Sequence, residues 1–159
     1  MNRSLLVISQ IVVVLLAIAV RMLAPGWWFV IIIMSFGLVA AISLAPLLLA
    51  AIMATVFAPS LRPHTLVTLV VADLAALSFA LTMTDFTDQS DDHLVPLAAL
   101  VTGDGNVSAS AASIFDSVAG WSFIVGIVAG IAVAVLSVVD HVRAGRADRA
   151  RQFLTPAVG

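Results

Sequence analysis

Cysteine, lysine, glutamate and tyrosine are all absent from this chain of 159 residues, and only 10% of its residues are charged. Without cysteine there are no disulfide bonds, thiolate metal sites or thiol redox chemistry. An average soluble domain carries about 25% charged residues, so a soluble globule could not cover its surface with so few. The scarcity of charge therefore excludes an ordinary cytosolic enzyme, a nucleic-acid binder and a disordered chain.

Apolar sequence takes the place of the missing charge: 62% of the residues are hydrophobic, and the mean hydropathy is +1.19. All seven cations are arginine and all nine acids are aspartate, which gives a net charge of −2. This bias is typical of genomes with a high GC content, such as those of actinobacteria. The composition as a whole indicates an integral membrane protein.

Four apolar stretches predict an all-α, polytopic protein with a four-helix transmembrane bundle, because a helix needs about 20 apolar residues to cross about 30 Å of hydrocarbon. One bundle domain is expected over 1–142, followed by a tail over 143–159. The first stretch is long for a signal peptide and is expected to be retained. The predicted spans are residues 4–23, 27–58, 64–84 and 119–140.

The second stretch is too long for one upright helix, and Pro46 interrupts it. One kinked or tilted helix is the simplest account, because proline removes a backbone hydrogen bond. A re-entrant hairpin around Pro46 and two short spans are the alternatives.

The arginines predict the orientation. In a four-span protein Arg3, Arg62 and the basic tail fall on one side, and the positive-inside rule makes that side cytoplasmic, together with both termini. The acidic loop over 85–118 is then external, and the expected location is the cell membrane. Arg21, near the outer end of the first span, is the exception and could snorkel to the head groups. A five-span protein with Arg3 outside is the alternative.

Asp73 is the strongest functional candidate within the spans. It lies some ten residues past Pro63, hence roughly 15 Å deep, and a carboxylate there costs about 2.5–3.5 kcal/mol. It therefore needs a partner. Gln10 in the first span is one possibility, whereas Arg21 would have to reach inward. Two interpretations stay open: a carboxyl group that packs helices or docks a subunit, and a proton or cation site.

Small residues recur every four positions in the last span, which places them on one helix face. Two of them form the Gly-xxx-Gly pattern that lets helix backbones approach closely in lipid. The pattern predicts a helix–helix contact, with a span of this chain, a second copy or a different protein as partner. The residues are Ser122, Gly126, Gly130 and Ala134.

Two polar clusters lie outside the spans. Asp88, Asp91, Asp92 and His93 are weak candidates for a metal site, because their spacing matches neither an EF-hand loop nor a zinc pattern, and a solvated loop is expected instead. The basic tail could contact anionic lipid or a cytoplasmic partner, or serve only to fix the topology. Its arginines are Arg143, Arg146, Arg149 and Arg151.

The sequence contains no Walker A loop, dinucleotide-binding glycine motif, nucleophile elbow or His-Glu-x-x-His motif, so we expect neither enzymatic activity nor a cofactor. The leading interpretation is a non-catalytic accessory or scaffolding subunit of a larger membrane complex. Its expected partners are the lipid bilayer and other membrane subunits or further copies of itself, and not nucleic acid. A proton- or cation-linked transporter or channel, working as a homo-oligomer through Asp73, is the first alternative. A phage holin is the second.

Overall fold

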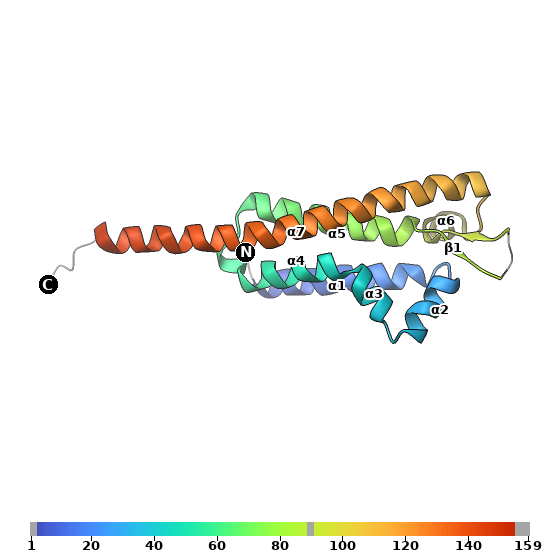
Figure 1. Cartoon of the computed structure of the whole chain (residues 1–159), viewed down its shortest axis with the longest axis horizontal. Helices are drawn as coiled ribbons and strands as arrows, with labels where there is room; N and C mark the ends of the chain where they lie inside the picture. The colour runs from blue at the N-terminus through green and yellow to red at the C-terminus, as the bar shows by residue number, and fades with distance from the viewer. Residues whose placement is uncertain (1–2, 89–90, 155–159) are drawn as a thin grey trace.

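The computed structural model describes residues 3–88 and 91–154, and helices make up most of this part of the chain (Figure 1). The short strands β1 and β2 pair antiparallel, with Asp85 opposite Leu94 and Phe86 opposite His93. The elements are α1 Arg3–Arg21, α2 Trp27–Met34, α3 Leu38–Ser43, α4 Ala45–Val56, a 3-10 turn Ala58–Ser60, α5 Pro63–Thr82, β1 Asp85–Phe86, β2 His93–Leu94, α6 Pro96–Thr102 and α7 Ala109–Leu154.

Within the described residues, three helices are long and apolar enough to cross a membrane: α1, α5 and the part of α7 over Ala109–Arg151. This confirms the prediction of an all-α protein with candidate membrane-spanning helices, three of them where four spans were predicted. The ends of α5 follow from its sequence. Pro63 occupies its first position, where proline's missing N–H costs no hydrogen bond, and Met83 after its last residue is extended.

The single kinked helix predicted over 27–58 is wrong, because this stretch forms α2, α3 and α4 in succession. Between α2 and α3, Phe36 and Gly37 have positive φ angles of 51° and 79°, which a right-handed helix cannot contain. The second break lies at Leu44, and Pro46 sits in the first turn of α4. Pro46 therefore starts a helix instead of kinking one.

The last helix is longer at both ends than the predicted span over 119–140. It begins at Ala109, within the stretch expected to be loop, and continues through the arginines of the tail. At about 1.5 Å per residue its 46 residues extend roughly 69 Å, more than twice the thickness of a hydrocarbon layer. In Figure 1 the C-terminal part of α7 projects past all the other helices.

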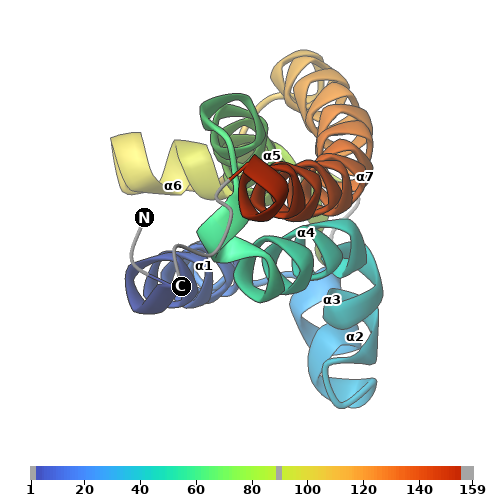
Figure 2. The ribbon, with the colours of Figure 1, turned by 90° about the vertical axis from the view of Figure 1, so that its left-hand side faces the viewer.

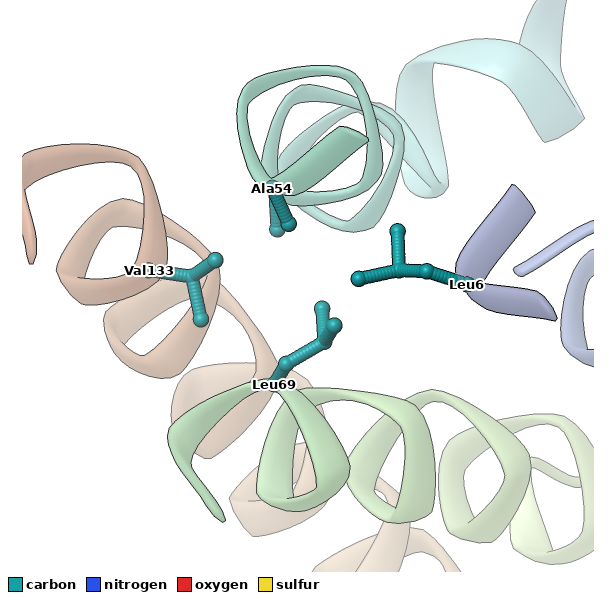
Figure 3. Packing of buried hydrophobic residues seen from close by; sticks show 5 residues of the cluster. Leu6, Ala54, Leu69 and Val133 are labelled. Carbon is teal, nitrogen blue, oxygen red and sulfur yellow. The ribbon is translucent and has the colours of Figure 1, made fainter. Parts of the chain in front are cut away.

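The helices pack side by side around one axis, with α7 along α5 and α4, and α1 along α5 (Figure 2). α1 begins and α7 ends toward the same end of the bundle, whereas the strands and α6 lie at the other end (Figure 1). The helices α1, α4, α5 and α7 each contribute a side chain to one buried hydrophobic cluster. Leu6, Ala54, Leu69 and Val133 meet there, each at most 5% exposed (Figure 3).

Candidate functional site

The buried polar side chains of the bundle lie at three levels along its axis, and each level joins helices. The middle level contains Asp73. The Gln10 Nε2 of α1 donates a hydrogen bond of 2.9 Å to the Asp73 Oδ2 of α5. Gln10 is only 5% exposed, and Asp73 is half-buried. The structure thus brings together the carboxyl group and the amide that the sequence suggested as its partner.

Two oxygen atoms at this middle level accept no hydrogen bond from the part of the chain that the structure describes: Gln10 Oε1 and Asp73 Oδ1, both buried. A buried acceptor without a donor is unfavourable, by about 1–3 kcal/mol in typical proteins. The Gln10–Asp73 hydrogen bond therefore joins α1 and α5 and leaves two buried oxygen atoms that could each accept a further hydrogen bond.

Arg21 does not reach Asp73, and it does not snorkel to head groups. It is 7% exposed, and its Nη2 lies 2.8 Å from Asp85 Oδ2 in a buried ion pair. Its Nη1 donates to the Met83 carbonyl at 2.6 Å. The expectation that Arg21 faces the interface is thus corrected: the first residues after α5 fold back over the end of α1 and supply both its acceptors.

Asp85 is fully buried and accepts from more than Arg21. Its Oδ1 accepts from the backbone N–H groups of Trp28 and Phe86, both at 2.9 Å, and its Oδ2 also accepts from that of Gly26 at 3.3 Å. A Cβ atom at Gly26 would lie 2.6 Å from the Asp85 carboxyl carbon, so only glycine fits there. The carboxylate ties α1, the start of α2 and β1 together.

A second buried carboxylate lies at the opposite end of the bundle. Asp140 of α7 is 1% exposed, and its Oδ2 accepts from Thr65 Oγ1 at 2.6 Å and from the Arg62 N–H at 3.0 Å. Arg62 Nε and His64 Nε2 each lie 3.7 Å from its Oδ1. The sequence analysis missed Asp140 because it fell on the boundary of a predicted span. The predicted topology did place Asp140 and the Arg62 turn on the same side of the membrane, and this was the signal from which their contact could have been predicted.

The small residues of α7 contact helices of the same chain. A Cβ at Gly130 would lie 2.6 Å from the Pro46 carbonyl oxygen of α4, whereas one at Gly126 would lie 3.7 Å from the Ala75 Cβ of α5. Ser122 Oγ lies 2.8 Å from Ser78 Oγ of α5. Ala134 is half-buried on the same side of the helix. The predicted close approach thus falls on α4 and α5.

The acidic residues of the loop hydrogen-bond to neighbouring segments. Asp88 Oδ1 accepts from Trp27 Nε1 at 2.9 Å. Asp92 accepts from Thr87 Oγ1 at 2.8 Å and from Asn106 Nδ2 at 2.9 Å. Asp91 lies in the turn before β2 and His93 is the first residue of β2, and within residues 3–88 and 91–154 no three His or Asp side chains are grouped to hold a metal. These contacts fold the loop onto α2 and β2.

The four arginines of the tail are exposed and lie on the helical extension of α7. They form part of a segment that we call the α7 arm, residues 141–154. The arm continues the direction of α7 past the level of Asp140 (Figure 1). The structure thus places these arginines on a helix that continues the last predicted span.

Comparisons of this chain with protein-family models, with curated proteins and with solved structures found no match. The functional argument therefore rests on the geometry of the bundle.

Proposed function

We propose that the protein crosses the cell membrane four times, through α1, the α2–α4 stretch, α5 and α7, with both termini in the cytoplasm. The charge distribution supports this orientation. Arg3, Arg62 and the arginines of the α7 arm gather at one end of the bundle, whereas the other end holds the aspartates of the loop. Arg21 is the cation at the loop end, and Asp85 pairs with it. The positive-inside rule assigns the arginine-rich end to the cytoplasm.

In this membrane the protein acts as a non-catalytic accessory or scaffolding subunit of a larger complex. The observation that carries the proposal is α7, which packs along α4 and α5 and then continues as the α7 arm. A helix anchored over such a length by two neighbours is a rigid support. It presents its arginines to a cytoplasmic partner at a fixed place relative to the membrane.

The reach of the arm favours a protein partner over lipid head groups. At about 1.5 Å per residue, Arg143 lies roughly 5 Å past Asp140 and Arg149 roughly 14 Å past it. Electrostatic attraction to a lipid surface falls off within about 8 Å at physiological salt. The outer part of the arm therefore extends beyond the head groups. Its four arginines, against the single Asp148, suit an acidic protein surface.

The test is native mass spectrometry on protein extracted from its own membranes with a mild detergent. We expect an unlike chain at fixed stoichiometry, and a loss of that chain of at least tenfold when Arg146→Gln and Arg149→Gln are combined. Arg3→Gln removes a charge on the same predicted side but off the arm, and should leave the complex intact.

Orientation is checked in the same preparations with single cysteines, which are unique reporters in a chain without cysteine. Labelling of Val101→Cys and Ala150→Cys from opposite sides shows that α7 crosses the membrane, and labelling of Ser4→Cys from the same side as Ala150→Cys supports four spans over three or five. Labelling of Val101→Cys and Ala150→Cys from one side contradicts the arrangement. A wild-type protein that is purely homo-oligomeric would contradict the role as a subunit of a larger complex.

One observation favours the second candidate function, a proton- or cation-linked transporter that works as a homo-oligomer. The unpartnered Gln10 Oε1 and Asp73 Oδ1 are two oxygen acceptors at the middle of the bundle. Oxygen atoms of this kind are the ligands that hard cations prefer, and a carboxylate is also a proton acceptor.

Asp73→Asn separates the two functions. If the carboxyl group only joins helices, asparagine should be nearly silent, because its carbonyl can accept from Gln10 Nε2 while its amide donates to Gln10 Oε1. Asp73→Leu should then lower the free energy of unfolding by about 0.6–2 kcal/mol, the range for interhelical hydrogen bonds in membranes. A transporter would instead lose flux with asparagine as completely as with leucine, since an amide cannot take up a proton.

The measurements are unfolding in detergent and ion flux into liposomes that contain only this chain. We expect no flux with the wild-type protein and a loss of stability confined to the leucine variant. Wild-type flux that Asp73→Asn abolishes would establish the transporter and overturn the scaffolding role.

A further inference from the structure

The breaks in the second apolar stretch leave a partly open cavity beside the bundle. The segment formed by α2 and α3, residues 27–43, leans away from the other helices as an elbow (Figures 1 and 2). A cavity of about 320 Å³ lies between this elbow and the helices α1, α5 and α7. Its lining includes Ile18, Ile32, Val39, Ala80, Gly120 and Phe123. Pockets for small ligands begin at about 300 Å³ and are lined mainly by apolar side chains.

Water is a poor occupant of this cavity. The charged side chain in its lining, Arg21, already donates to Asp85 and to the Met83 carbonyl. The hydroxyl in its lining, Ser43 Oγ, donates to the Val39 carbonyl at 2.9 Å. A buried water needs two to four polar partners, and the side chains of the lining offer few: the remaining N–H groups of Arg21, the Ser43 oxygen and the Trp28 indole N–H, among apolar residues. An apolar occupant therefore suits this cavity better than water.

The form of the cavity favours a flexible occupant. A helix about 10 Å wide enters only as a rigid cylinder, whereas a hydrocarbon chain can bend along the lining and leave its remainder in the bilayer. The cavity is about twice the 150 Å³ space that holds one benzene molecule, which suits a flexible hydrocarbon chain. The helices that line it are apolar and membrane-spanning, so bilayer lipid supplies such chains at the highest concentration.

We infer that the cavity binds one acyl chain of a membrane lipid, held between the α2–α3 elbow and Phe79, Ala80 and Phe123 of the bundle. The lipid enters with its head group toward the end of the bundle where Arg21 and Asp85 lie. That end is external in the proposed topology, so the placement of this lipid in the outer leaflet rests on the proposed function. The binding of an acyl chain in the cavity does not depend on it.

The experiment uses vesicles containing a phosphatidylglycerol that carries a photoreactive diazirine midway along one acyl chain. After illumination of the reconstituted full-length protein, we expect adducts on Phe79, Ala80 and Phe123. Gly120→Leu should reduce these adducts at least fivefold, because a side chain there points into open space: an added Cβ meets no atom within 4 Å. Adding the lipid to one leaflet only then reports the orientation separately.

Gly145→Leu is the matched control, since this glycine of α7 is equally uncrowded but lies in the arm, and its replacement brings the same gain in helix propensity. Ala40→Leu fills the cavity from the elbow and keeps the test valid if Gly120→Leu does not fold. Equal labelling in the filled and control variants would overturn the inference. So would labelling confined to outward-facing residues such as Val128, which is 63% exposed.

Discussion

Gly130→Ile is expected to separate α7 from α4 and to lower the free energy of unfolding by about 3 kcal/mol or more. The reason is backbone contact. Any side chain at this position starts with a Cβ 2.6 Å from the Pro46 carbonyl oxygen and 2.9 Å from its carbonyl carbon, and backbone atoms cannot rotate away as a side chain can. Overpacking of a filled core typically costs about 1–3 kcal/mol, and a clash against a helix backbone lies at or above the upper end of this range.

A matched pair of alanine substitutions gives the sharpest measurement. Gly130→Ala should already destabilise the bundle in detergent unfolding. Gly126→Ala, one turn earlier on the same face, should be neutral or slightly stabilising, because its Cβ would make an ordinary contact of 3.7 Å with Ala75. Val128→Ile is an additional control, since Val128 is 63% exposed. Val133, another valine of α7, cannot serve as a control because it is fully buried in the core. Equal losses for the two alanine variants would show that the close approach at Gly130 is not what holds α7.

How far the sequence predicts this structure depends on the range of the interactions. Composition and the length of the apolar runs predict membrane helices, because each helix satisfies its own backbone whatever its neighbours do. Asp73 and Gln10 could be proposed as partners because a buried carboxyl group in an apolar helix needs a hydrogen-bond partner. The breaks at Gly37 and Leu44 were missed because the surrounding residues are mostly apolar, with Ser35 and Ser43 as the exceptions, and a left-handed residue leaves no trace in hydropathy.

The ion pairs at the two ends of the bundle were beyond prediction for a different reason. Arg21 and Asp85 are 64 residues apart in the sequence, with α2, α3, α4 and α5 between them, and their contact requires the chain after α5 to fold back over α1. Asp140 likewise meets Thr65 only because α7 packs along α5. Charge counting assigns such residues to one side of a membrane but treats them as exposed. Burial between helices is a property of the packed bundle.

Asp85→Ala is expected to have the second large effect, a loss of about 3–5 kcal/mol. It leaves the Arg21 guanidinium buried with the Met83 carbonyl as its remaining acceptor, and removing one partner of a buried pair typically costs this much. It also removes the acceptor of the Trp28 N–H at the start of α2. The end of the bundle at which α1, α2 and β1 meet should loosen first, which hydrogen exchange would localise.

Replacing the other partner, Arg21, separates the contribution of the ion pair to stability from that of the backbone hydrogen bonds to Asp85. Arg21→Met should cost clearly less than Asp85→Ala, because the carboxylate it leaves behind keeps the N–H donors of Gly26, Trp28 and Phe86. Adding Arg21→Met to Asp85→Ala should recover part of the loss, since no unpaired cation then remains. Asp88→Ala serves as the control: this loop aspartate is exposed and accepts from the Trp27 indole, so its replacement should stay within about 1 kcal/mol. An Arg21→Met loss as large as that of Asp85→Ala would mean that the cation, and not the carboxylate, organises this end of the bundle.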